Sequence, residues 1–195
     1  MMIAPTTAPP VHAGAAAEYF AATSRVADSF FTARADDIAT ACLAMASCFA
    51  NGGRMFVCGD GAQRSDVAHV VVEFIHPVVV GKRALPALAL PDIENGAARQ
   101  WVSVMARRGD LLLLLAPASL SAAALDVLTS AREEGLTTMV LAGESAVGVR
   151  AIDHLFAVPS LDAFIVQETH EMLYHILWEL VHVFLDHRTP EAGRV

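Results

Sequence analysis

Charged side chains are scarce in this sequence of 195 residues. Asp, Glu, Lys and Arg make up 17% of it, whereas hydrophobic residues make up 55%. Soluble domains average about 25% charged residues, and a domain of this length has too little interior to bury so much apolar surface. We therefore expect extensive contacts between subunits, because obligate interfaces resemble a core cut in half.

Clusters of positive charge are also absent. The net charge is −8, and the thirteen Lys and Arg residues are scattered, with no run longer than the pairs Lys82-Arg83 and Arg107-Arg108. Binding to a phosphate backbone relies on clustered basic side chains. The composition therefore argues against a nucleic-acid partner.

The sequence shows no sign of secretion or of a membrane span. Its three cysteines (Cys42, Cys48, Cys58) are odd in number and lack a CxxC spacing, which suits a reducing compartment. Residues 1–17 contain no Lys or Arg, unlike a secretory signal. No segment offers about 18 uninterrupted apolar residues. We predict a cytoplasmic protein without a membrane partner.

The chain is expected to hold a disordered leader over residues 1–14 and a single domain over 15–195. The leader is rich in Pro, Thr and Ala. Apolar residues at helical spacing predict an N-terminal helical hairpin, with helices over 15–34 and 36–50. The glycines of Asn51-Gly52-Gly53 end the second helix.

Strands and helices alternate in the rest of the chain. Apolar runs predict strands over 54–58, 85–90, 110–115, 136–141 and 154–158, and helices over 63–75, 95–107, 121–134 and 162–186. Mostly apolar strands separated by helices are typical of a parallel sheet covered on both faces. We therefore predict an α/β three-layer sandwich with a five-stranded parallel sheet, whose ligands bind at the carboxyl ends of the strands.

Three segments carry residues suited to chemistry. The turn over 58–66 has two glycines that let a ligand approach the backbone, although a tight turn capped by Ser65 or Asp66 explains it equally well. His69 and Glu73 share one helix face, where they can bind a metal or exchange a proton, or form an ordinary surface pair. The valines that flank this pair indicate that the helix is largely buried. A buried histidine and glutamate need partners, which favours a functional role for the pair.

The last helix is the third segment. Gln167 and His175 can border one cleft, although Glu171 and His175 form a competing pair at i, i+4. Four polar residues of this helix are expected to form a solvated stripe on its surface and not a functional site: Glu168, Glu171, Glu179 and His182.

The order of these motifs resembles that of the phosphoheptose (sedoheptulose 7-phosphate) isomerases of the SIS fold, over residues 36–186. The resemblance rests on the glycine turn, the His-x-x-x-Glu helix, Pro86-Ala-Leu-Ala-Leu90, Ala131-Arg-Glu-Glu-Gly135 and the last helix. It implies a flavodoxin-like strand order and a homotetramer with active sites at subunit interfaces.

The resemblance also implies a site. A divalent metal, with zinc the expected ion, would be held by His69, Glu73, Gln167 and His175, with Glu73 as the enolisation base and His175 as the acid. The substrate is expected to be a sugar or sugar phosphate, which a carboxylate and an imidazole can isomerise through an enediol while a metal polarises the carbonyl. Expected substrate contacts are Gly59, Asp60, Gly61, Gln63, Asp66, Asp92, Ser119 and Ser121.

The phosphate-binding loop departs from the family pattern. Ala116, Pro117 and Ala118 stand where the family has Ser, Thr and Ser, and only Ser121 is kept. Each lost hydroxyl removes a hydrogen bond to a charged group, worth about 1.5–3 kcal/mol. Two interpretations follow: an isomerase with an altered substrate, or a non-catalytic SIS paralogue that acts as a ligand or metal sensor or as a protein-binding scaffold.

Overall fold

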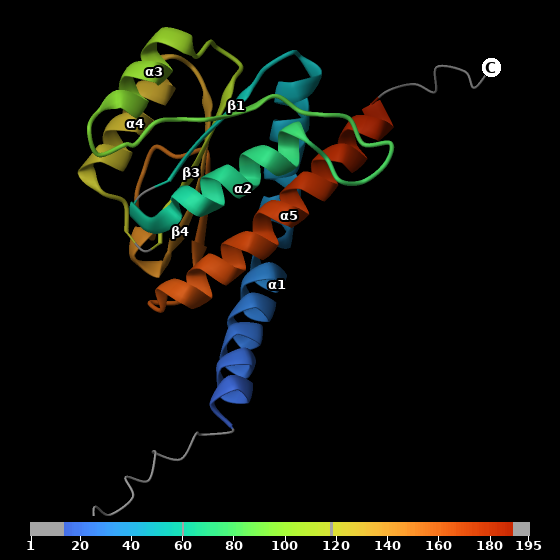
Figure 1. Cartoon of the computed structure of the whole chain (residues 1–195), viewed down its shortest axis with the longest axis vertical. Coiled ribbons are helices and arrows are strands. Elements are labelled where there is room, and N and C mark those ends of the chain that lie inside the picture. Colours follow the sequence, from blue (N-terminus) through green and yellow to red (C-terminus); the bar gives the residue numbers. More distant parts are fainter. Residues whose placement is uncertain (1–13, 60, 118, 189–195) are drawn as a thin grey trace, which may run out of the picture.

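The fold is built on one five-stranded parallel sheet. The computed structural model describes residues 14–59, 61–117 and 119–188. In these residues the sheet has the order β2-β1-β3-β4-β5, as the resemblance to the SIS fold implied; Figure 1 labels its central strands. Its strands are β1 (Met55–Gly59), β2 (Ala87–Ala89), β3 (Leu111–Leu115), β4 (Thr137–Gly143) and β5 (His154–Val158).

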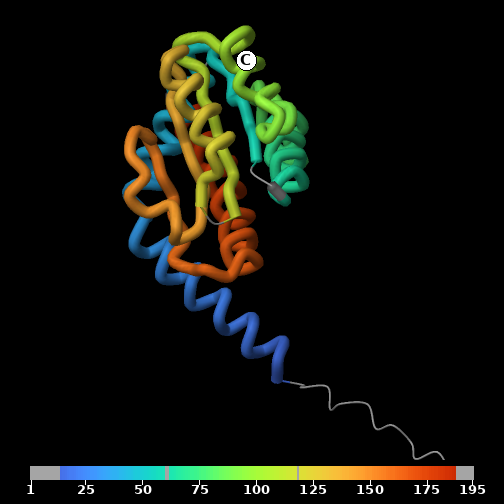
Figure 2. The backbone as a smooth tube through the Cα atoms, turned by 90° about the vertical axis from the view of Figure 1, so that its left-hand side faces the viewer, coloured from blue at the N-terminus to red at the C-terminus, as the bar shows by residue number. Residues whose placement is uncertain are grey.

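Helices cover both faces of the sheet (Figures 1 and 2). They are α1 (Ala15–Ala50), α2 (Arg64–Ile75), α3 (Ala97–Met105), α4 (Ala122–Glu133) and α5 (Ala163–Arg188). One core packs α1, α2 and α5 against the sheet, and a second packs α3 and α4 against its other face. The all-leucine strand β3 serves both, with Leu111, Leu113 and Leu115 in the first core and Leu112 and Leu114 in the second.

The predicted N-terminal helical hairpin is wrong. Residues 15–50 form a single helix of 36 residues. The predicted break at Arg34-Ala35-Asp36 contains no glycine or proline, and Arg34 pairs with Asp37 at 3.3 Å one turn later. The N-terminal part of α1 extends beyond the sheet layers (Figures 1 and 2), and Phe20 on this part is 73% exposed.

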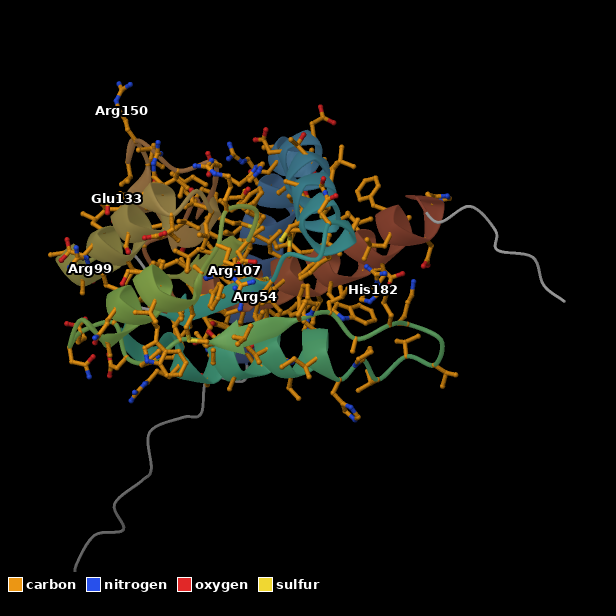
Figure 3. The ribbon with its side chains drawn as sticks, turned by 90° about the horizontal axis from the view of Figure 1, so that it is seen from above. Arg54, Arg99, Arg107, Glu133, Arg150 and His182 are labelled. Carbon is orange, nitrogen blue, oxygen red and sulfur yellow. The ribbon has the colours of Figure 1, made fainter. Side chains whose placement is uncertain are left out.

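The N-terminal ends of β1 and β3 are fixed by one buried carboxylate. Asp110 accepts hydrogen bonds from the backbone N–H of Arg54 at 2.8 Å, from the Arg54 guanidinium at 2.7 Å and from the backbone N–H of Arg107 at 2.9 Å. Figure 3 shows Arg54 and Arg107 lying close together. Because β1 and β3 start together and run parallel, their carboxyl ends meet at one edge of the sheet.

The predicted disordered leader, residues 1–14, lies outside the described residues except for Gly14. Within the described ranges, none of the helices is long and apolar enough to span a bilayer.

Candidate metal and catalytic site

Three predicted ligands from two helices meet at one point. His69 and Glu73 lie one turn apart on α2, and His175 lies on α5. One ligand atom from each residue lies within 4.8 Å of the other two. The contact between α2 and α5 therefore assembles a cluster from residues more than 100 positions apart, which we call the His69–Glu73–His175 cluster.

The two distances from Glu73 to the histidines fit the ligand spacing of a tetrahedral metal. Glu73 Oε1 lies 3.3 Å from His69 Nε2 and 3.5 Å from His175 Nε2. Ligand atoms at about 2.1 Å from a tetrahedral zinc ion are separated by about 3.4 Å. A separation of 3.5 Å is long for a hydrogen bond. Two imidazoles and a carboxylate are also a ligand set typical of zinc, so the residues fit this ion.

Gln167, the fourth predicted ligand, is tied to α2 through Asp66. Its Nε2 donates to Asp66 Oδ1 at 3.1 Å. Asp66 is buried and lies one turn before His69 on α2. Because a carboxylate only accepts, this bond fixes which end of the Gln167 amide faces Asp66 and leaves the amide oxygen, the atom a metal would use, pointing elsewhere.

Tyr174 contacts both histidines of the cluster. Its hydroxyl oxygen lies 2.9 Å from His69 Nδ1, and its ring packs edge-on against the rings of His69 and His175 with centroid separations of 5.3 and 4.9 Å. Burial raises the pKa of the Tyr174 phenol, with smaller contributions from the charges of Glu171, Asp66 and Glu73. The phenol therefore stays neutral and keeps its proton.

The cluster opens into two hollows that meet at His175. A hollow of about 430 Å³ is bordered by His69, Glu73, His175 and Trp178. Trp178 closes one side, where its indole N–H donates to the Glu73 carbonyl at 3.0 Å. A second hollow, also of about 430 Å³, lies between α1 and α5 and includes Glu171. A small ligand can therefore reach the cluster from outside.

The predicted contacts of the first loop lie around the start of α2. Gly59 ends β1, where a Cβ would come within 2.9 Å of Gln63 Cβ, so the close turn requires glycine. Gly61 begins a short 3-10 helix, and Asp60 lies outside the described residues. Gln63 is buried, and its Oε1 has no hydrogen-bond partner among the described residues.

A small hollow beside this loop holds a further predicted contact. Asp92 follows β2 and pairs with Arg64 at 3.2 Å. Both residues border the hollow together with Gly59. The carboxyl ends of β1 and β2 are therefore polar, with the positive charge of Arg64 already paired.

The loop after β3 offers few donors for a phosphate. Ala116 is fully buried, and Ser119 is exposed. Ser121 is the N-cap of α4, where its Oγ accepts a hydrogen bond from the Ala124 backbone N–H at 3.1 Å. The serine kept from the family pattern therefore stabilises the helix start.

His182 does not belong to a solvated stripe, as its polar neighbours in sequence suggested. It is buried, with Nδ1 2.8 Å from the Trp178 carbonyl and Nε2 3.1 Å from the Arg83 carbonyl. Figure 3 places it beside the chain segment that follows α2. The stripe prediction failed because this imidazole packs inside the protein, where its two ring nitrogens lie within hydrogen-bond distance of backbone carbonyls.

Sequence reasoning missed Tyr174 and Trp178 as parts of the site. A signal for Tyr174 was present, because positions 167 and 174 are seven residues apart and so share a helix face. Trp178 gave no such signal, since its bond goes to a backbone carbonyl of another helix.

Comparison with known proteins gives the family. A family model described as the SIS domain matches residues 18–143. The phosphoheptose isomerase of Desulfovibrio desulfuricans is 29% identical over 176 residues, covering 83% of this chain and 83% of that protein. That of Pelobacter propionicus is 30% identical over 146 residues, covering 68% and 77%.

The fold agrees with this relationship. A solved structure of a phosphoheptose isomerase from Francisella tularensis superposes with a TM-score of 0.75 at 24% identity, covering 88% of this chain and 98% of that one. The chain belongs to the SIS-domain family, and its similarity within that family is to the phosphoheptose isomerases.

Proposed function

We propose that this protein is a metal-assisted aldose–ketose isomerase acting on a sugar or sugar derivative. The observation that carries the proposal is the His69–Glu73–His175 cluster, in which three ligand-type atoms lie within 4.8 Å of one another beside an open hollow. Curated relatives named phosphoheptose isomerase support the reaction class.

In the proposed reaction Glu73 and His175 move the protons. Glu73 removes a proton from the carbon next to the substrate carbonyl while His175 donates one to the carbonyl oxygen, which gives an enediol. His175 then takes the proton of the neighbouring hydroxyl, and Glu73 returns its proton to the former carbonyl carbon. Glu73 Oε1 faces both imidazoles at 3.3 and 3.5 Å, which leaves the second carboxylate oxygen for the substrate proton. Trp178 holds the Glu73 backbone and so orients this side chain.

Residues His69, Glu73, Gln167 and His175 would hold the divalent metal, with zinc the expected ion. When bound, such an ion polarises the substrate carbonyl and favours loss of the neighbouring proton.

We further propose that the substrate differs from sedoheptulose 7-phosphate in the group that the β3 loop would hold. Alanine has no side-chain donor and proline lacks the backbone one, so Ala116, Pro117 and Ala118 offer less to a phosphate than a Ser/Thr loop. Two cations that would compensate for lost hydroxyls are already paired, Arg64 with Asp92 at 3.2 Å and Lys82 with Asp186 at 3.4 Å.

The same loop supports a second candidate function, a non-catalytic sensor of a sugar or metal or a scaffold for a partner protein. Binding energy from a remote phosphate commonly drives chemistry elsewhere on the substrate, so its loss lowers turnover as well as affinity. The two candidates differ in whether proton transfer occurs, which an isomerase assay measures.

We also propose a homotetramer in the cytoplasm. Exposed apolar side chains support the oligomer, among them Phe20 on α1, Phe164 on α5 and Val78 and Val80 after α2. The hollows beside His175 border these segments, so a neighbouring subunit would cover them. Burial raises the pKa of the Cys42 and Cys48 thiols to about 12, so they stay protonated, which is compatible with a reducing compartment.

The test is a coupled isomerase assay on zinc-loaded and chelator-treated protein. Substrates are sedoheptulose 7-phosphate and a panel of unphosphorylated and differently phosphorylated sugars. We expect zinc-dependent turnover of a panel sugar that Glu73→Gln abolishes, and little turnover of sedoheptulose 7-phosphate. A triple variant, Ala116→Ser, Pro117→Thr and Ala118→Ser, should raise the latter. Turnover of no sugar by either protein would favour the sensor or scaffold, and robust wild-type turnover of sedoheptulose 7-phosphate would refute the altered substrate.

A further inference from the structure

Tyr174 is the side chain that touches the cluster most extensively without being a candidate ligand. It is only 1% exposed, so its hydroxyl cannot turn to bulk water. The hydroxyl oxygen lies 2.9 Å from His69 Nδ1, the nitrogen on the far side of the imidazole from Glu73. The two ring nitrogens of His69 therefore have two fixed and different partners.

The partners determine where the proton of a neutral His69 lies in the absence of a metal. Glu73 Oε1 is 3.3 Å from Nε2, and an ionised carboxylate can only accept a hydrogen bond. The proton is therefore held on Nε2, and Nδ1 is left as an acceptor. The Tyr174 O–H donates to it across 2.9 Å.

A metal on Nε2 reverses this arrangement. A metal takes the lone pair of Nε2, so the ring proton must lie on Nδ1, which then needs an acceptor. The tyrosine oxygen can accept as readily as its O–H can donate. A backbone carbonyl or a carboxylate at this place would match only the metal-bound tautomer, and a backbone N–H only the metal-free one.

The geometry points to Tyr174 as a positioning residue that satisfies His69 Nδ1 in both tautomers and so holds the imidazole in place for metal binding. This inference rests on the proposed metal site and goes beyond it, since it assigns a role to a residue that binds neither metal nor substrate. The edge-on contacts of the Tyr174 ring with His69 and His175 restrict both imidazoles to one orientation.

The variant Tyr174→Phe tests the contribution of the hydroxyl independently of the contribution of the ring. Phenylalanine keeps the edge-on packing and the buried volume but leaves Nδ1 without a partner. The chain offers a control in its only other tyrosine, Tyr19, whose hydroxyl donates to Glu168 at 3.3 Å. Tyr19→Phe removes the same group from an exposed position on α1, where the described residues place no histidine ring nitrogen in hydrogen-bond contact with it.

The experiment has two readouts. The first is zinc affinity by competition with a chromophoric chelator, for the wild type, Tyr174→Phe and Tyr19→Phe. We expect Tyr174→Phe to bind zinc about 10-fold more weakly or worse, as is typical when the outer partner of a ligand histidine is lost, and Tyr19→Phe to match the wild type. The second is the histidine ¹⁵N spectrum of metal-free protein at pH about 8.5, well above the ordinary histidine range.

In that spectrum both proteins should show His69 with its proton on Nε2, because Glu73 is unchanged. The Nδ1 resonance should be that of a hydrogen-bonded nitrogen in the wild type and should move to the position of an unbonded imine nitrogen in Tyr174→Phe. Equal zinc affinity in wild type and Tyr174→Phe would overturn the role of Tyr174 while leaving the metal site intact. A wild type that binds no zinc would overturn the metal site, and the spectrum would still decide about Tyr174. An Nδ1 resonance unchanged by Tyr174→Phe would count against the role of Tyr174 in either case.

Discussion

The Gln167 side chain donates a hydrogen bond from Nε2 to Oδ1 of Asp66 over 3.1 Å, and so joins α5 to α2 beside the His69–Glu73–His175 cluster. Asp66 is buried, and its second oxygen, Oδ2, has no hydrogen-bond partner among the described residues. The NH₂ group of Gln167 therefore faces Asp66, and the amide oxygen, the atom that a metal would use, faces away from this carboxylate.

This relationship makes Asp66→Asn informative. Asparagine keeps the volume but presents either an oxygen or an NH₂ group, so the Gln167 amide is free to turn over. We expect zinc affinity to fall about 10-fold, in the range found when outer partners of metal ligands are altered. Chelator competition measures the affinity, with Asp126→Asn on the exposed face of α4 as the matched control. Equal affinities of both variants would contradict the role of Asp66.

A second prediction concerns His170, which is fully buried on α5. Burial lowers its pKa from 6.5 to about 4, and its Nε2 lies 3.3 Å from the Ala142 carbonyl. In the unfolded chain the imidazole takes up a proton below pH about 6.5, whereas in the folded protein it does so only near pH 4. The unfolded state therefore binds more protons in this window, and stability falls as the pH drops through it.

The size of this effect is at most about 3.5 kcal/mol, because the pKa falls from 6.5 to about 4 and a difference of one in pKa corresponds to about 1.4 kcal/mol. Urea denaturation between pH 6.5 and pH 4 should show the free energy of unfolding falling more steeply for the wild type than for His170→Gln, which carries no titrating group. His187→Gln, on the exposed end of α5, should keep the wild-type slope. Parallel curves for wild type and His170→Gln would rule out this contribution.

A third prediction contrasts two aspartates. Asp110 is buried and accepts three hydrogen bonds, two from Arg54 and one from the Arg107 backbone. Asp110→Ala leaves these donors unsatisfied and should destabilise the protein by about 3 kcal/mol or more. Asp37→Ala breaks an exposed pair with Arg34 at 3.3 Å and should cost less than about 1 kcal/mol. Thermal and urea denaturation compare the two, and equal losses would refute the ranking.

A fourth prediction tests the oligomer. Phe20 on α1 and Val104 on α3 are similarly exposed, at 73% and 76%, but lie on opposite sides of the sheet. We expect light scattering of the wild type to give four times the chain mass of 20.7 kDa. Phe20→Glu should lower the mass because it puts a charge into the proposed interface, and Val104→Glu should not. A wild-type mass of 20.7 kDa would end the proposal.

Much of the fold followed from local sequence patterns. Strand β3 is five leucines, and a strand buried on both faces needs no alternation, so its apolar run was readable. The hairpin failed because Arg34 and Asp36 suggested an end where neither glycine nor proline enforces one. Polar residues alone do not stop a helix whose apolar face continues to pack.

The candidate site was predictable only in part, because its two halves are more than 100 residues apart. The His69–Glu73 spacing is local and could be read, whereas the pairing of His175 with Glu73 depends on how α5 crosses α2. The same crossing buries Tyr174 and His182 against groups that no spacing rule reveals. The loss of hydroxyls after β3 could be read directly, but the use of Ser121 as a helix cap could not be told from a phosphate contact.

The most direct test of the central claim is zinc K-edge X-ray absorption of the protein loaded with one equivalent of zinc and dialysed. The account predicts a first coordination sphere of nitrogen and oxygen at about 2.0–2.2 Å, with the imidazole scattering pattern of two histidines, and its loss in His69→Ala/His175→Ala. Sulfur at about 2.3 Å, or zinc that washes out of the wild type, would contradict the account, because the ion would then not be held by the His69–Glu73–His175 cluster.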